Sequence, residues 1–211
     1  MTDPTTYLPI ADHVFAPLYP YYAEKIVEAT GVRAGICLDV GCGGGHLGLA
    51  LAELTQMHLC LLDKSHEMIE QAQANIVARG LEARARTIGG IVQAIPLPAA
   101  AVDLVVSRGS IPFWSDLPLA FSEIRRVLRP GGHAYLGGGL GPPEMREQIQ
   151  QAAHRLDSGW RGGGHRMVPR HPEGLYEVAL QEARIEGFRV MRGEDGTWIH
   201  FQKLSCEGER R

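Results

Sequence analysis

The sequence has little of several features that would point to particular classes of protein. Only 4 of its 211 residues are cysteine, and Cys37, Cys42, Cys60 and Cys206 form neither a CxxC pair nor a metal-ligand cluster. We therefore expect reduced structural thiols and no metal site. Lysine and arginine total 21 against 24 acidic residues, which gives a net charge of −3, and no basic run occurs. This balance disfavours nucleic acid as a partner.

Long apolar segments and targeting signals are also missing. No stretch approaches the roughly 18 apolar residues of a membrane-spanning helix. Residues 1–7 have neither the basic flank nor the apolar core of a signal peptide. These absences predict a cytoplasmic protein without a membrane span. The length, with 45% hydrophobic residues, suits one compact domain.

An apolar strand that leads directly into a glycine loop and a helix is the most informative feature present. Residues 37–46 have the sequence CLDVGCGGGH. Glycine lacks a Cβ, so the backbone at Gly41, Gly43 and Gly45 can turn tightly and approach a ligand, while the following helix offers free N–H groups. This loop is typical of a site for a nucleotide-like molecule.

Strand and helix patterns alternate along the chain, which predicts a parallel sheet with helices on both faces. The expected strands cover residues 35–39, 59–63, 83–88, 102–107 and 133–137, and the expected helices cover residues 46–54, 65–79, 117–128, 144–156 and 172–183. Ser65 is expected to cap the helix at 65–79, and residues 129–132 are expected to end the helix at 117–128. A closing antiparallel hairpin is predicted from residues 184–191 and 197–204, joined by a short polar turn.

The single domain divides into four parts. We expect an N-terminal helical cap at 1–33, a ligand-binding core at 34–137, a helical insertion at 138–172 and a C-terminal helix and hairpin at 173–204. Residues 158–171 contain three consecutive glycines and are interpreted either as a lid over a pocket or as a solvated loop.

Five short motifs follow one another between residues 38 and 132. They are Leu38-Asp-Val-Gly-Cys-Gly-Gly-Gly, Asp63, Pro96-Leu-Pro, Val102-Asp-Leu-Val-Val-Ser and Leu128-Arg-Pro-Gly-Gly. In order and spacing they resemble a class I S-adenosylmethionine-dependent methyltransferase, most of all the small enzymes related to ubiquinone and menaquinone methyltransferases. The resemblance implies an α/β Rossmann-like sheet of seven strands, mostly parallel with an antiparallel last strand. It also implies S-adenosylmethionine as cofactor and a small-molecule methyl acceptor, and it leaves a homodimer open.

The side chains near the loop suggest roles toward that cofactor. The Asp39 carboxylate would complement the methionyl ammonium. Asp63, about 20 residues beyond the loop, would accept both ribose hydroxyls, and its alternative is a capping or solvated turn residue. The set expected at the cofactor is Asp39, Gly41, Cys42, Gly43, Gly45, Asp63, Lys64, Met68, Gly90, Ile91, Val92, Ser107, Arg108 and Gly109.

One position departs from the family pattern. The family usually has an acidic residue after the third strand, where its carboxylate binds the adenine amino group, and this chain has Ile91 there. We expect the adenine to rest on backbone groups and apolar surface, with binding weaker by about 1–2 kcal/mol.

A dehydrogenase is the main alternative. Gly43, Gly45 and Gly48 also fit G-x-G-x-x-G, and Asp63 lies at the spacing expected for a dinucleotide ribose. Asp39 argues against it, because a negative charge two residues before the first glycine would repel a pyrophosphate. The closing hairpin likewise favours methyl transfer. A binding module that keeps S-adenosylmethionine without catalysis is the third interpretation.

The segment after the fourth long strand is expected to face the methyl acceptor, since open α/β sheets bind ligands beyond the carboxyl ends of their strands. Arg108 would hold a carboxylate or phosphate of the acceptor, or the cofactor's own carboxylate; the alternative is a salt bridge to Asp116 or Glu123. Phe113 and Trp114 either wall a pocket or pack in the core.

The N-terminal cap contributes a further group of candidates. In related enzymes this region folds over the cofactor, and by that similarity Tyr7, Tyr19 or Tyr22 would touch the cofactor or gate the pocket. An in-line displacement needs mainly alignment of nucleophile and methyl carbon, so the sequence assigns no catalytic base.

Overall fold

Seven strands form one twisted sheet in the computed structural model, which describes residues 8–156 and 172–204. The strand order is β3-β2-β1-β4-β5-β7-β6. Strands β1 to β5 run parallel to one another, and β7 is antiparallel to both β5 and β6. The expected sheet with an antiparallel last strand is confirmed. The strands are β1 (Ala34–Val40), β2 (Gln56–Asp63), β3 (Ala85–Gly89), β4 (Val102–Arg108), β5 (Leu128–Gly138), β6 (Arg189–Gly193) and β7 (Gly196–Gln202).

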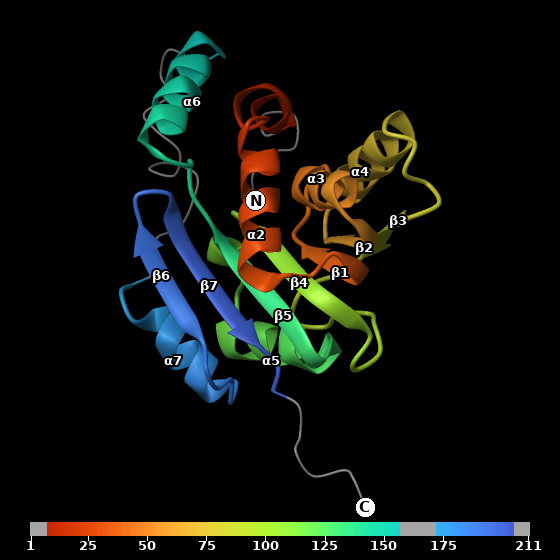
Figure 1. The fold of residues 1–211 in the computed structure, drawn as a ribbon, viewed down its shortest axis with the longest axis vertical. Helices are drawn as coiled ribbons and strands as arrows, with labels where there is room; N and C mark the ends of the chain where they lie inside the picture. The colour runs from red at the N-terminus through yellow and green to blue at the C-terminus, as the bar shows by residue number, and fades with distance from the viewer. Residues whose placement is uncertain (1–7, 157–171, 205–211) are drawn as a thin grey trace, which may run out of the picture.

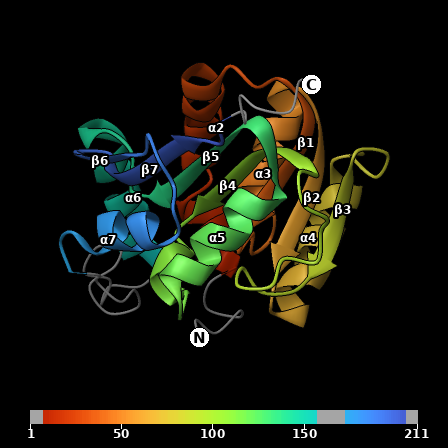
Figure 2. The same cartoon turned by 90° about the horizontal axis from the view of Figure 1, so that it is seen from below.

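Helices cover both faces of this sheet. One apolar cluster joins the sheet to α2, α3, α4 and α6, and a second joins its other face to α5 and α7. Figures 1 and 2 show the sheet between α2 on one side and α5 with α7 on the other. The helices are η1 (Ile10–Val14), α2 (Leu18–Thr30), α3 (His46–Leu54), α4 (His66–Ala78), η2 (Ile111–Phe113), α5 (Leu117–Val127), α6 (Pro143–Leu156) and α7 (Leu175–Glu182). Among the described helices, none is both long and apolar enough to cross a membrane.

Local side-chain chemistry explains where several helices begin and end. The Ser65 hydroxyl accepts the Met68 N–H at the start of α4, as the sequence predicted, and the Asp116 carboxylate accepts the Leu119 N–H at the start of α5. Gly31, with φ +69°, closes α2 in the left-handed region.

The start of β5 differs from the prediction. We expected residues 129–132 only to end a helix, but β5 already begins at Leu128. The partners of β4 jump from Leu128, opposite Val102, to His133, opposite Leu104, so a bulge absorbs the extra residues. On the other side, Gly131 donates to the Lys203 carbonyl and Lys203 donates to that of Gly132. The turn residues are therefore held as part of the sheet.

The C-terminal elements are shorter than expected. The helix predicted at 172–183 begins at Leu175, and the strand predicted from 184 begins at Arg189. Arg184, with φ +53°, donates its N–H to Gln181, and Ile185 donates to Leu180. These bonds close α7 and keep residues 184–185 out of the sheet. Residues 158–171, interpreted either as a lid or as a solvated loop, lie outside the described residues, as do Tyr7 and Cys206.

The carboxyl ends of the central strands meet at one edge of the sheet. This edge carries the loop after β1, Asp63 at the end of β2, the segment after β3 and Arg108 at the end of β4. Helix α6 packs against η1 and stands beyond this edge (Figure 1). The edge gathers the residues that the sequence analysis singled out.

Candidate functional site

The glycine loop is clamped between the end of β2 and the segment after β4. The N–H groups of Gly41 and Cys42 both donate to the Leu62 carbonyl, at 2.8 and 3.0 Å. Gly41 has φ +65°, and a Cβ at this position would lie 2.4 Å from the Ser110 Cβ. Ser110 in turn donates its hydroxyl to the Val40 carbonyl at 3.0 Å. A side chain at position 41 would push these two segments apart.

The Asp63 carboxylate is fixed by two backbone groups. Its Oδ2 accepts the Gly43 N–H at 2.9 Å, and its Oδ1 accepts the Ser65 N–H at 3.0 Å. Each carboxylate oxygen has two acceptor positions, so both oxygens retain capacity for a further donor. The carboxylate is thereby oriented beside the glycine loop, and its ribose role stays a prediction.

Asp39 lies beneath the loop and is 2% exposed. Its Oδ2 accepts the Gly48 N–H at 2.9 Å, in the first turn of α3. Burial raises the Asp39 pKa to about 7, while the Gly48 N–H opposes this shift and the Asp63 charge adds to it. The contact that the structure describes is with the protein, and the methionyl-ammonium role stays a prediction.

This raised pKa predicts how the stability of the ligand-free protein depends on pH. An unfolded Asp has a pKa of about 3.9, so between that pH and about 7 the folded state holds a proton at Asp39 that the unfolded state has lost. The contribution of Asp39 to stability therefore falls as pH rises through this window. Asp39→Asn retains an acceptor for Gly48 and removes the titration. We expect the Tm of D39N minus that of the wild type to increase between pH 5 and pH 8 in thermal scans. A difference independent of pH would contradict the shift.

The other predicted cofactor residues fall into three positions around this edge. Lys64 is exposed and Met68 is buried in the first turn of α4. After β3, the Ile91 side chain is 46% exposed. The Val92 side chain is buried in the core, so Val92 can offer a ligand only its backbone groups. The remaining predicted residues can offer a ligand only a small side chain or backbone groups, and they are Cys42, Gly90, Ser107 and Gly109. The buried Ser107 hydroxyl lies 2.6 Å from the Ser110 hydroxyl.

Arg108 extends from the end of β4 into a group of aromatic rings. Its guanidinium carbon lies 5.0 Å from the ring centroid of Phe15, 5.3 Å from that of Tyr19 and 5.7 Å from that of Tyr22. One terminal nitrogen donates to the Gly139 carbonyl at 3.0 Å. The cap and the β4 end therefore meet at this side chain.

The salt bridge considered for Arg108 is wrong. Asp116 caps α5 through the Leu119 N–H, and Glu123 pairs with Arg126 at 2.6 Å. Both carboxylates satisfy groups of α5 and its surroundings, which leaves Arg108 without either of them.

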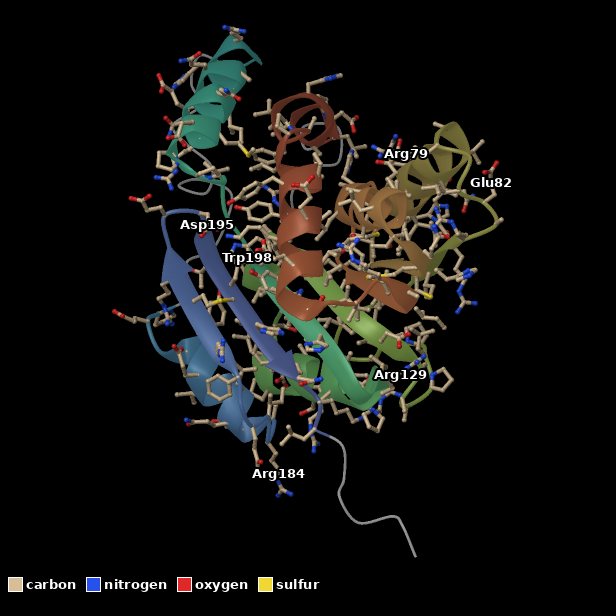
Figure 3. All side chains as sticks on the ribbon, viewed as in Figure 1. Arg79, Glu82, Arg129, Arg184, Asp195 and Trp198 are labelled. Atoms are coloured by element: carbon tan, nitrogen blue, oxygen red, sulfur yellow. The ribbon has the colours of Figure 1, made fainter. Side chains whose placement is uncertain are left out.

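Tyr22 connects the cap to two distant segments. Its hydroxyl donates to the Asp195 carbonyl at 2.7 Å and accepts the Gly141 N–H at 2.9 Å. Lys25 forms an ion pair with the Asp195 carboxylate, and Figure 3 shows Asp195 beside α2, with Trp198 further along β7. Burial raises the Tyr22 pKa. The hydroxyl thus remains a neutral donor that pins α2 to the β6–β7 turn.

Asp12 is a contact that sequence reasoning missed. Its Oδ1 lies 2.6 Å from His46 Nε2, and the His46 ring stacks on Tyr19 with centroids 4.8 Å apart. Burial lowers the His46 pKa, and the hydrogen bond to Asp12 opposes that shift. A cavity of about 350 Å³ is lined in part by Asp12, His46 and Asn75. No local pattern joins residues 34 positions apart, so only the fold brings this pair together.

The aromatic residues after β4 separate into two environments. Trp114 is 9% exposed, packs edge-to-face against Phe121 with centroids 6.0 Å apart and donates its ring N–H to Ser110. Trp114 therefore packs in the core, which is one of the two interpretations that the sequence left open. Phe113 is 37% exposed, and its role toward an acceptor stays a prediction.

The strand order and the glycine loop after β1 are those of a class I methyltransferase. A methyltransferase domain family matches residues 38–136. A malonyl-acyl-carrier-protein O-methyltransferase of Geobacter sulfurreducens is 33% identical over 194 residues, which are 89% of this chain and 69% of that protein. A crystal structure from Methanococcus maripaludis, assigned as an S-adenosyl-L-methionine-dependent methyltransferase, has a TM-score of 0.88 and 35% identity, and the match covers 97% of this chain and 94% of that one. The chain belongs to the class I S-adenosylmethionine-dependent methyltransferases.

The coverage of relatives is uneven. A malonyl-acyl-carrier-protein O-methyltransferase of Methylovorus sp. is 37% identical over 126 residues, which are 57% of this chain and 41% of that protein. The chain thus spans less than half the length of this relative. Family membership makes S-adenosylmethionine the cofactor and excludes the dehydrogenase alternative.

The described residues fit that cofactor. The loop offers bare backbone at three glycines, with the carboxylates of Asp39 and Asp63 below and beside it. No lysine or arginine occurs between residues 39 and 63. This acidic surrounding suits a ligand with a sulfonium, an ammonium and ribose hydroxyls, and it would repel a pyrophosphate.

Proposed function

We propose that this chain transfers a methyl group from S-adenosylmethionine to a small-molecule acceptor by in-line displacement. The observation that carries the proposal is the oriented Asp63 carboxylate, held by Gly43 and Ser65 beside the glycine loop, at the same edge of the sheet as Arg108 and the aromatic rings around it. Cofactor-binding groups and a partly apolar, cationic surface therefore share one edge of the sheet. A homodimer stays a prediction.

Positioning supplies the catalysis in this proposal. When bound, the cofactor supplies an electrophilic methyl carbon on a positively charged sulfur. Asp63 and the glycine loop hold its ribose and methionyl parts, and the buried rings of Tyr19 and Tyr22 exclude water from the acceptor side. Holding nucleophile and methyl carbon in line lowers the barrier without a proton acceptor at the first step.

An acceptor with a carboxyl group is the favoured class. The names of the curated relatives specify O-methylation of a malonyl group on acyl-carrier protein, which is a carboxyl methylation. Arg108 supports this class here, because a guanidinium matches a carboxylate in geometry and charge. The identity to these relatives is modest, so the acceptor itself belongs to the proposal.

Calorimetry and product release test the proposed function directly. We expect S-adenosylmethionine and S-adenosylhomocysteine to bind the purified chain, and a panel of acceptors that includes malonyl thioesters to release S-adenosylhomocysteine. Absence of cofactor binding at millimolar concentration would refute the assignment of the site.

Ile91→Asp is expected to tighten cofactor binding. Ile91 is exposed after β3, and a carboxylate there would accept the adenine amino group, which is worth about 1 kcal/mol or roughly five-fold in Kd. Isothermal titration of the variant against the wild type measures this. Ile91→Asn supplies a neutral acceptor of the same size as a matched control, and an unchanged Kd in both variants would show that the backbone already satisfies the ring.

A further inference from the structure

Arg108 is a partly buried cation without a counter-ion among the residues that the structure describes. No carboxylate lies within salt-bridge distance of its guanidinium in residues 8–156 and 172–204. Its Nε is buried and has no hydrogen-bond partner within the described part of the chain. Buried polar groups are nearly always paired, so an orphaned charged donor indicates a partner that arrives with a ligand.

The acidic residues of this region are already committed. Asp12 bonds to His46, Asp195 pairs with Lys25, and Asp39 and Asp63 accept backbone N–H groups of the loop and helices. None of these contacts involves Arg108. These four carboxylates therefore serve other groups of the protein.

The surrounding rings position the cation rather than neutralise it. A cation over an aromatic face gains electrostatic attraction from the ring, but this attraction does not satisfy the Nε–H. Phe15, Tyr19 and Tyr22 all belong to the N-terminal cap, and Gly139 follows β5 and takes one terminal nitrogen. Three rings and one carbonyl thus restrict the fork of the guanidinium and leave the Nε–H for another acceptor.

We propose that Arg108 receives a carboxylate that enters with the ligands of the methyl-transfer site. The inference rests on the proposed function and names the recognition chemistry of the same site. Two sources carry this group: the methionyl portion of the cofactor, and a carboxyl group of the acceptor. A guanidinium donates to a carboxylate through Nε and a terminal nitrogen in one plane, and such charge-assisted pairs are about twice as strong as neutral hydrogen bonds.

The Nε–H of Arg108 itself supplies the readout. In ¹⁵N-labelled protein its Nε–H cross-peak is identified by its loss in Arg108→Lys. Three probes are titrated: S-adenosylhomocysteine, its decarboxylated amine, and malonate, the last into both free and S-adenosylhomocysteine-loaded protein. A carboxylate partner shifts this cross-peak and slows its exchange with water.

Each source gives its own pattern. A shift with S-adenosylhomocysteine but not with its decarboxylated form assigns the cofactor carboxylate, and Arg108→Met then weakens S-adenosylhomocysteine about ten-fold or more in calorimetry while the amine binds as to the wild type. A shift only on addition of malonate assigns the acceptor carboxylate, and Arg108→Met then abolishes malonate binding with cofactor affinity retained. A cross-peak that none of the three probes moves overturns the proposal.

A matched control separates this role from general loss of charge. Arg129 pairs with Asp103 at the opposite edge of the sheet. Figure 3 labels Arg129 at that edge. We expect Arg129→Met to leave all three titrations unchanged. If Arg108→Met folds poorly, Arg108→Lys replaces it, because lysine keeps a positive charge among the rings. The Tm of Arg108→Lys measures how much the packing of the arginine side chain contributes to stability. Wild-type protein that binds no S-adenosylhomocysteine would refute the proposed function, whereas the malonate titration of free protein still decides the role of Arg108.

Discussion

Replacing Asp63 by alanine is expected to weaken S-adenosylmethionine binding by about two orders of magnitude while the protein stays folded. Two hydrogen bonds from ribose hydroxyls to a carboxylate are worth about 1.5 kcal/mol each, and about 3 kcal/mol corresponds to roughly 100-fold in Kd. The variant also releases the Gly43 N–H, which Asp63 holds at 2.9 Å. Isothermal titration with S-adenosylhomocysteine measures the loss, and a thermal scan checks the fold.

Asp103→Ala is the matched control for this experiment. Asp103 likewise accepts a backbone N–H, that of Ile36 at 2.6 Å, and it pairs with Arg129 at the opposite edge of the sheet. We expect it to lower stability without changing cofactor affinity. Equal affinity in Asp63→Ala and the wild type would remove the ribose role of Asp63, leaving it as an anchor of the loop alone.

Gly41→Ala should destabilise the protein by about 3 kcal/mol and abolish cofactor binding at micromolar concentration. An added Cβ would lie 2.4 Å from the Ser110 Cβ and 2.6 Å from its Oγ, well inside contact distance. Relief requires the loop or the segment after β4 to move, and such movement breaks the hydrogen bonds to Leu62 and Val40. Chemical denaturation and calorimetry report the two losses.

Gly80→Ala separates the steric clash from backbone conformation. Gly80 has φ +64°, close to that of Gly41, but no atom lies within 4 Å of its added Cβ. The left-handed conformation alone costs about 1–2 kcal/mol. We expect Gly80→Ala to lose only that amount and to bind cofactor normally. Similar losses in both variants would show that the contact with Ser110 is not what requires glycine at 41.

Much of the fold could be predicted because its signals are local. The glycine loop, the apolar run of β4 and the Ser65 cap each occupy a few consecutive residues, and their order predicted the parallel core. The error at the start of β5 occurred where pairing between distant strands decides the structure. The sequence of residues 129–132 indicates a turn, yet backbone bonds to Lys203 hold it within the sheet.

The candidate site shows the same division. Asp63 could be singled out from its spacing to the loop. The unpaired Nε–H of Arg108 could not be predicted, because Asp116 and Glu123 are kept from pairing with Arg108 by their own contacts in three dimensions. The Asp12–His46 pair had no sequence signal for the same reason. Motif spacing thus locates the cofactor edge, whereas the acceptor side depends on packing.

The contacts of Tyr22 join segments that lie far apart in the sequence. Its hydroxyl joins partners 119 and 173 residues away, at Gly141 and Asp195. Closing such long loops costs conformational entropy, and contacts between distant residues slow folding. During synthesis the first five strands and the glycine loop emerge well before the turn that carries Asp195. The hydrogen bond between Tyr22 and Asp195 can therefore form only after almost all of the described chain has been synthesised.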